Sequence, residues 1–212
     1  MANHVLNNFN FIQNKINRIS KSTRLIVITK NRSYEDILPI ITSNHLDYGE
    51  NKVQEAFNKW SCKLSLNNQI KLHLVGKLQS NKAKQAFNLF DFIHTLDSDK
   101  LAKIFSSLEN ETKIKKKYFI QVNIGNEPQK SGVKIDKLTE FVNYCSKNLD
   151  LNVLGLMCLP PVDQDPRKYF LKLNELNTFY GFKELSMGMS NDYEEAILCG
   201  STFVRVGSAV FN

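Results

Sequence analysis

One lysine in this sequence stands where an amine could do covalent chemistry. Lys30 directly follows Arg24 to Thr29, a short and mainly apolar run that is typical of a strand buried on both faces of a parallel sheet. An amine that is partly removed from water has a lowered pKa, and its neutral form can condense with an aldehyde. The alternative is a lysine whose stem follows the strand end into water and has no chemical role.

Two further segments have the composition of a phosphate-binding site. Ser186 to Ser190 (SMGMS) and Arg205 to Ser208 (RVGS) combine hydroxyl donors with glycines that let the backbone approach an anion closely. Asn191 and Asp192, which follow the first segment, can begin the next helix. Either segment alone could be an ordinary turn. Together they predict a site for a phosphate group.

Arg205 precedes Gly207 by two positions, so its side chain is expected to point to the same end of the sheet. A guanidinium is a permanent hydrogen-bond donor and never an acceptor. Against a pyridine nitrogen it would keep that nitrogen unprotonated, and against a phosphate it would anchor the anion. A third possibility is a salt bridge at the rim of the sheet.

Strands alternate with helical patterns along the whole sequence, after an initial helix at about Asn3 to Ser20. Strands are expected at 24–29, 46–49, 71–75, 92–95, 118–123, 152–157, 183–186 and 202–206. The helices between them are expected at 33–43, with a cap at Ser33, and at 52–60, 80–89, 99–108, 136–147, 166–180 and 192–199. Such alternation implies parallel strands joined by right-handed crossovers.

Eight strands predict a closed (β/α)₈ barrel of the TIM type, formed by one α/β domain of residues 1–212. An open doubly wound sheet is the alternative. In a closed barrel the first strand neighbours the eighth, which places Lys30 beside both phosphate segments. Polar residues also follow other strands where barrel proteins carry their sites, namely Glu50 and Asn51, His94 and Thr95, and Asn123.

Composition and charge bound the class of protein. With 42% hydrophobic residues the chain can bury a core unaided, and no apolar run is long enough to span a bilayer. The formal charge of +7 raises the question of nucleic-acid binding, but the tight lysine run at 113–117 lacks interleaved aromatics and is interpreted as a solvated helix end. The four cysteines show no CxxC spacing, so we expect thiols in a reducing cytoplasm and no metal site.

The chain resembles the pyridoxal phosphate homeostasis proteins, a family similar in fold to the N-terminal barrel of alanine racemase, with fold-type III binding of pyridoxal 5′-phosphate (PLP). The resemblance runs almost end to end and in order. It is carried by ITK at 28–30, YGENKVQEA at 48–56, HLVGKLQSNKAK at 73–84, HTLDSDKLA at 94–102, QVNIGNEPQKSG at 121–132, GLMCLPP at 155–161, LSMGMSNDYEEAI at 185–197 and GSTFVRVGSAVF at 200–211.

The resemblance implies that Lys30 holds PLP as a Schiff base. It assigns the phosphate to Ser186, Met189, Ser190, Gly207 and Ser208. Arg205 resembles the arginine that meets the pyridine nitrogen, with a phosphate contact as the alternative. Three further positions match motifs around the cofactor, namely Asn51, His73 and Met157. After Lys30 the chain has Asn31 and Arg32, where the family commonly has Thr-Lys.

The expected function is a PLP carrier that buffers or delivers vitamin B6 and influences amino-acid balance. The cofactor supplies the chemistry, and turnover needs an added substrate pocket with a positioned acid or base. Racemases of this fold take a tyrosine from an additional C-terminal domain, whereas this sequence ends at Asn212, soon after Gly207. We therefore expect a monomer that turns over no substrate, with PLP-dependent apoenzymes as transient recipients. A racemase-like enzyme is the alternative, and Lys77, Lys82 or Lys84 could carry a secondary adduct.

Overall fold

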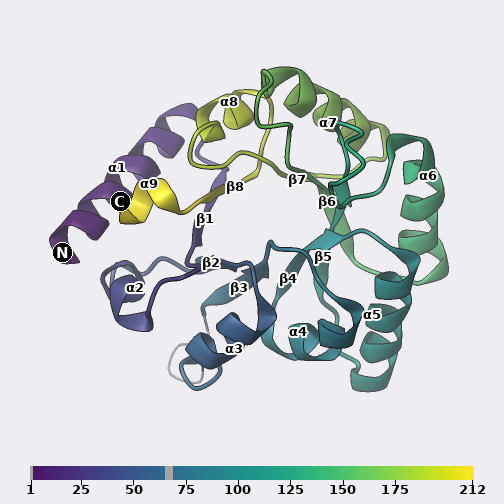
Figure 1. The fold of residues 1–212 in the computed structure, drawn as a ribbon, viewed down its shortest axis with the longest axis horizontal. Helices are drawn as coiled ribbons and strands as arrows, with labels where there is room; N and C mark the ends of the chain where they lie inside the picture. Colours follow the sequence, from purple (N-terminus) through teal and green to yellow (C-terminus); the bar gives the residue numbers. More distant parts are fainter. Residues whose placement is uncertain (1, 65–68) are drawn as a thin grey trace.

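The computed structural model describes residues 2–64 and 69–212 and shows a closed barrel of eight parallel strands in chain order (Figure 1). β1 pairs with both β2 and β8, which closes the barrel and rules out the open sheet. The strands are β1 (Arg24–Ile28), β2 (Asp47–Glu50), β3 (Lys71–Leu74), β4 (Phe92–Leu96), β5 (Lys117–Val122), β6 (Val153–Cys158), β7 (Glu184–Ser186) and β8 (Phe203–Val206).

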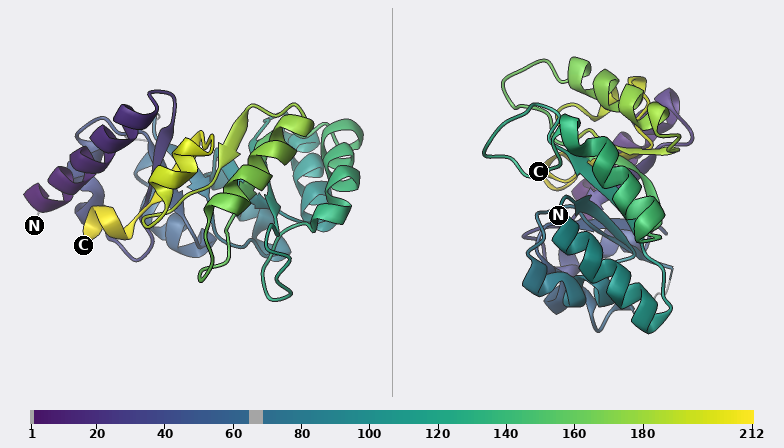
Figure 2. Two further views of the ribbon diagram at one scale, coloured as in Figure 1. Left: turned by 90° about the horizontal axis from the view of Figure 1, so that it is seen from above. Right: turned by 90° about the vertical axis from the view of Figure 1, so that its right-hand side faces the viewer.

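Helices surround the barrel, and the first and last of them lie side by side, so that the two ends of the described chain meet (Figures 1 and 2). The α-helices are α1 (Ala2–Ile19), α2 (Tyr34–Ile41), α3 (Val53–Trp60), α4 (Ala83–Leu89), α5 (Asp99–Thr112), α6 (Ile135–Asn143), α7 (Arg167–Phe179), α8 (Tyr193–Leu198) and α9 (Ser208–Phe211). A 3₁₀ turn, η2 (Ser80–Lys82), precedes α4, and a π-helical turn, η3 (Tyr144–Asn148), follows α6. The short helix α9 was not predicted from the sequence.

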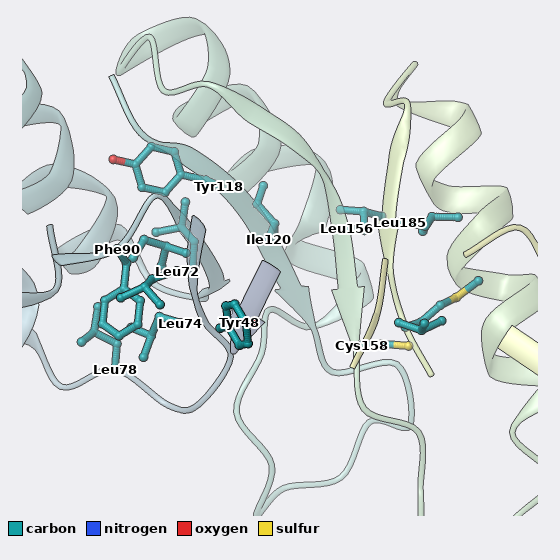
Figure 3. Close-up of a cluster of buried hydrophobic side chains, with 14 of the residues drawn as sticks. Tyr48, Leu72, Leu74, Leu78, Phe90, Tyr118, Ile120, Leu156, Cys158 and Leu185 are labelled. Atoms are coloured by element: carbon teal, nitrogen blue, oxygen red, sulfur yellow. The ribbon is translucent and has the colours of Figure 1, made fainter. Parts of the chain in front are cut away.

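The strands divide their side chains between two separate cores. Successive residues of a strand point to opposite faces, so one set faces the helices and the other fills the barrel. The outward set forms the larger cluster, part of which Figure 3 shows, with Leu72, Leu74, Ile120 and Leu156 among its members. The apolar part of the inward set is small and consists of Ile26, Ile28, Phe92, Phe119, Met157 and Phe203.

A loop follows the carboxyl end of each strand and leads to the next helix. The loops after β5 and β6 project together beyond the helices on one side (Figure 2, left view). The two loops approach closely at Gly125, where an added Cβ would lie 2.6 Å from Pro161 Cγ. No helix in the described part of the chain is long and apolar enough to cross a membrane.

Gly155 allows β6 and β7 to pair at their native spacing. It lies opposite Glu184, and a Cβ at this position would fall 1.7 Å from the Glu184 carbonyl oxygen. We expect Gly155→Ala to lower the free energy of unfolding by about 2 to 3 kcal/mol, because the strand must shift to accommodate the methyl group. Urea unfolding measures the change.

Gly181→Ala is the matched control for Gly155→Ala. Gly181 has a φ of +71°, and an added Cβ would meet nothing within 4 Å, so alanine there adds backbone strain without a clash. We expect a loss of about 1 kcal/mol. Equal losses for both variants would contradict the close approach at Gly155.

Candidate functional site

A pocket of about 550 Å³ opens at the carboxyl ends of the strands. Seven of the ten residues proposed from the sequence line it, namely Lys30, Asn51, Met189, Ser190, Arg205, Gly207 and Ser208. The loop after β6 forms a wall that the sequence had not indicated as part of the site, with Leu159, Pro160, Pro161 and Val162. The two consecutive prolines shortly after a strand were the available signal, because proline stiffens a loop.

Lys30 lies beside β8, as barrel closure predicted. Val27 of β1 pairs with Val206 of β8, which brings the residues that follow both strands together at the pocket. The Lys30 side chain is exposed, so the expectation of a partly desolvated amine is wrong. Exposure on the wall of a pocket instead leaves the amine accessible to an incoming aldehyde.

The peptide before Lys30 is held by a buried ion pair beneath the pocket. Lys59 Nζ donates to the Thr29 carbonyl oxygen at 2.6 Å and to Glu50 Oε1 at 2.9 Å. The same Glu50 oxygen accepts from the Thr29 hydroxyl at 2.6 Å and from Trp60 Nε1 at 2.8 Å. The Lys59 and Glu50 side chains are 7% and 0% exposed. This cluster fixes the end of β1 from which Lys30 extends.

Asn31 and Arg32, where the chain departs from the family pattern, have structural roles in the same turn. Asn31 has a φ of +58°, in the left-handed region that asparagine adopts more readily than most residues. Its N–H donates to a Glu55 carboxylate oxygen. Arg32 donates to Asn212 Oδ1 at 2.9 Å and lies over the Phe211 ring, so it ties this turn to α9.

The two predicted phosphate segments bring backbone N–H groups together. The N–H groups of Gly207 and Ala209 converge on Ser190 Oγ, at 3.3 and 3.5 Å. A Cβ on Gly207 would lie 3.0 Å from the Ile28 carbonyl oxygen, so glycine permits the close approach of β8 to β1. Convergent N–H groups beside a hydroxyl are suited to an anion.

Asp192 and Gly188 fix the backbone of the first phosphate segment, before α8. The Met189 N–H donates to Asp192 Oδ1 at 2.6 Å, which fixes the turn before α8. Gly188 has a φ of +92°, and a Cβ there would fall 2.5 Å from Ala196 Cβ. The predicted helix start at Asp192 is confirmed, since α8 begins at Tyr193.

Arg205 is 4% exposed, yet it lines the pocket. Its Nη1 donates to Ser186 Oγ at 2.7 Å, and its Nη2 donates to the Cys158 carbonyl oxygen at 2.9 Å. Burial lowers the pKa of Arg205 to about 10, so the guanidinium is still charged at neutral pH. In the described chain its partners are a hydroxyl and a carbonyl, which argues against a salt bridge at the rim.

Ser186, His73 and Met157 do not line the pocket. All three are fully buried and belong to the inward face of the barrel. Ser186 is connected to the pocket by its hydrogen bond with Arg205, and His73 lies deeper in the barrel. His94, the other histidine at a strand position, joins them: His94 Nδ1 lies 2.8 Å from Ser186 Oγ, and His94 Nε2 lies 2.9 Å from His73 Nδ1.

This series of contacts continues to the amino ends of the strands. His73 Nε2 lies 2.9 Å from Asp47 Oδ1, and Arg24 donates to both oxygens of the same carboxylate. We call Arg24, Asp47, His73, His94, Ser186 and Arg205 the interior network. Among the described residues no group of three or more His, Cys, Asp or Glu side chains is placed to hold a metal ion.

Burial affects the protonation of three histidines. Burial lowers the pKa of His73 and His45 below 6.5, and burial, together with the nearby His73 ring and the Arg205 charge, lowers the pKa of His94 well below it. The unfolded chain binds protons at these sites as the pH falls through 6.5, whereas the folded chain does not.

We expect the free energy of unfolding to fall as the pH drops from 7 to 5.5. The slope should approach about 1.4 kcal/mol per pH unit for each histidine that stays neutral. Urea unfolding along this series measures the slope, which should be smaller in His94→Leu. A stability that is constant from pH 7 to 5.5 would contradict the burial of neutral histidines.

Comparison with known proteins identifies the family to which the chain belongs. The family model for the alanine racemase N-terminal domain matches residues 2–212. Three of the similar curated proteins are named pyridoxal phosphate homeostasis protein. That of Aquifex aeolicus is 38% identical over 77% of this chain and 75% of the relative, that of Vibrio cholerae is 34% identical over 98% and 92%, and that of Escherichia coli is 31% identical over 92% and 87%.

Solved structures agree with this placement. PipY of Synechococcus elongatus, solved with PLP bound, superposes with a TM-score of 0.90 at 28% identity and covers 98% of this chain and 100% of its own. Alanine racemase of Clostridium difficile superposes with a TM-score of 0.73 at 10% identity, over 96% of this chain and 56% of its own, and shows the shared barrel fold. This chain therefore belongs to the alanine racemase N-terminal domain family and, within it, to the pyridoxal phosphate homeostasis proteins.

Proposed function

We propose that this chain binds PLP in the pocket at the carboxyl ends of its strands, holds it reversibly through Lys30 and serves as a carrier of the cofactor. The observation that supports this most strongly is the lining of a single pocket by three complementary groups. These are an accessible amine at Lys30, a buried and charged guanidinium at Arg205, and the Gly207 N–H, which converges with that of neighbouring Ala209 on Ser190 Oγ.

The residues present fit the cofactor in charge and in shape. PLP carries a phosphate, a ring nitrogen that accepts hydrogen bonds and an aldehyde. Arg205 has five N–H donors, of which two are engaged by Ser186 and Cys158. The others remain for a ligand in the pocket. Gly207 keeps the backbone of β8 close to β1, so a side chain does not separate Lys30 from the phosphate segments.

When bound, PLP supplies an aldehyde that condenses reversibly with a primary amine. In this proposal Lys30 provides the amine, and Ser190, Ser208 and the N–H groups of Gly207 and Ala209 hold the phosphate. Arg205 contacts the ring nitrogen or the phosphate. Asn51, which follows β2, also lines the pocket.

A carrier role is favoured by the charged groups in the pocket. Its titratable lining side chains, among the described residues, are Lys30, Arg205 and Asp192. Arg205 cannot serve as a base near neutral pH, and the Asp192 carboxylate already accepts the Met189 N–H. Since turnover of an amino acid needs a positioned acid or base in addition to the cofactor, we propose that this chain releases PLP without turnover.

Titration of the purified chain with PLP tests the proposal, with absorbance as the measurement. We expect saturable binding of one PLP, and binding of pyridoxal, which lacks the phosphate, that is weaker by roughly tenfold or more. Equal affinity for the two would contradict the phosphate assignment, and absence of binding would contradict the function. Exchange of the α-proton when amino acids are added to the loaded protein would contradict the carrier role.

We also propose that the chain acts as a monomer in the cytoplasm and passes PLP to PLP-dependent apoenzymes. The buried thiols of Cys145 and Cys158, whose pKa burial raises to about 12, suit a reducing compartment. Light scattering tests the monomer, and activation of an apoenzyme by the loaded protein tests delivery.

A further inference from the structure

The interior network crosses the whole barrel, from the amino ends of the strands to the pocket. Arg24 and Asp47 begin β1 and β2, His73 and His94 lie midway along β3 and β4, and Arg205 reaches the pocket. The network runs between Ile26, Phe92, Phe119 and Phe203, and both histidine rings stack on phenylalanines, at 4.2 and 4.4 Å. Polar groups in such surroundings are costly unless every one is hydrogen-bonded.

The two ends of the network determine the position of every proton in it. Arg24 donates to the Asp47 carboxylate, and these bonds and the His73 bond lower the pKa of Asp47 although burial alone would raise it. The carboxylate only accepts, so His73 must carry its proton on Nε2. His73 is neutral, so its Nδ1 accepts and must receive a proton from His94 Nε2.

The same reasoning continues to the pocket. Neutral His94 with a proton on Nε2 has a bare Nδ1, which accepts from the Ser186 hydroxyl. Ser186 Oγ has then donated its only proton, and it accepts from Arg205 Nη1, which can only donate. Each bond therefore points from Arg205 towards Asp47. The carboxylate at one end sets this order, and the guanidinium at the other end, which can only donate, is compatible with it.

We propose that His94 and His73 are positioning residues that lock the Arg205 guanidinium in one orientation at the cofactor pocket, through a single direction of hydrogen bonding set by Asp47. The importance of this orientation for PLP rests on the proposed function. The network orients and does not conduct protons, because it ends at a guanidinium that stays charged and at a carboxylate paired with Arg24. The one-way network directs the Ser186 hydroxyl proton to His94 Nδ1, so that Ser186 Oγ accepts from Arg205 Nη1 while Nη2 donates to the Cys158 carbonyl oxygen.

Nuclear magnetic resonance of the chain without PLP tests the network directly. In protein labelled with ¹⁵N at histidine, long-range ¹H–¹⁵N spectra distinguish the tautomers, and the His73→Leu and His94→Leu variants assign the signals. We expect both rings to be neutral with the proton on Nε2 at pH 7. A proton on Nδ1 of either ring would overturn the proposal.

Exchange of the Arg205 guanidinium protons with water tests the positioning role. We expect His94→Leu to accelerate this exchange by roughly tenfold or more, the scale on which removal of an orienting hydrogen bond acts at buried sites. Phe119→Leu is the matched control, because it removes the buried ring that stacks on His94 but no hydrogen bond, and it should change the exchange far less than His94→Leu. Equal acceleration in both variants would overturn the proposal.

Two further measurements allow the positioning role to be tested even if His94→Leu does not fold or the proposed function is wrong. Ser186→Ala, which removes only the hydroxyl, should accelerate Arg205 exchange like His94→Leu and serves if that variant does not fold. In protein loaded with PLP, His94→Leu should raise the dissociation constant about tenfold and Phe119→Leu less than about twofold. If the wild type binds no PLP, the proposed function fails, whereas the exchange rates still decide the inference.

Discussion

Replacement of Lys30 by alanine is expected to abolish covalent retention of PLP and to weaken its binding by roughly 100-fold, about 2.7 kcal/mol. Lys30 extends from the end of β1 into the pocket, beside the segments proposed to hold the phosphate. Without its amine only the noncovalent contacts remain. Absorbance titration measures the affinity, and intact mass after borohydride treatment measures the adduct.

Lys84→Ala is the control for Lys30→Ala. Lys84 is an exposed lysine of α4 that does not line the pocket, so its loss should change neither the affinity nor the adduct. An adduct of undiminished yield in Lys30→Ala would contradict the assignment. Lys77, which lines a neighbouring pocket, would then be the first lysine to examine.

Glu50→Gln is expected to lower the free energy of unfolding by about 3 to 5 kcal/mol, the scale of breaking a buried ion pair by removal of one partner. The change leaves the buried Lys59 ammonium with only its longer contact to a carboxylate, at 3.5 Å to Glu55 Oε1. It can also place an amide N–H₂ at the Oε2 position, which is buried and has no hydrogen-bond partner in the described chain. Urea unfolding measures the loss.

The double variant Glu50→Gln with Lys59→Met is the informative comparison. It removes both charges, so it should be more stable than Glu50→Gln alone. Additive losses in the two single variants and the double variant would show that the ion pair does not couple these residues. Because Lys59 also binds the Thr29 carbonyl oxygen, the variants should disturb the turn that carries Lys30.

The barrel could be predicted because its signals are local and repeated. Continuous apolar runs mark strands buried on both faces, and the cap at Ser33 is confirmed by its reciprocal hydrogen bonds with Asp36. Once eight strands were counted, closure placed Lys30 beside Gly207. The sequence therefore indicated most of the pocket lining without any contact being known.

The assignment of side chains within the strands could not be predicted, because both faces of these strands are buried. An apolar run does not show which alternate residues face the barrel interior and which face the helices. Met157 faces the interior and Cys158 the helices, and Met157 is fully buried there and does not line the pocket. His73 likewise faces inward and reaches the site only through other side chains.

Contacts between distant side chains were equally hidden. Nothing in the sequence near Lys30 points to Lys59, whose ammonium binds the peptide before it, or to the ion pair with Glu50. The short helix α9 was missed because four residues are too few to show a helical pattern.

Tandem mass spectrometry of the wild-type chain, loaded with PLP and reduced with borohydride, tests the central claim most directly. Reduction fixes the cofactor to the amine that held it, and peptide fragmentation then identifies that residue. We expect the adduct on Lys30, in a yield close to one per chain. Absence of any adduct, or an adduct mainly on Lys77, Lys82 or Lys84, would contradict the proposal.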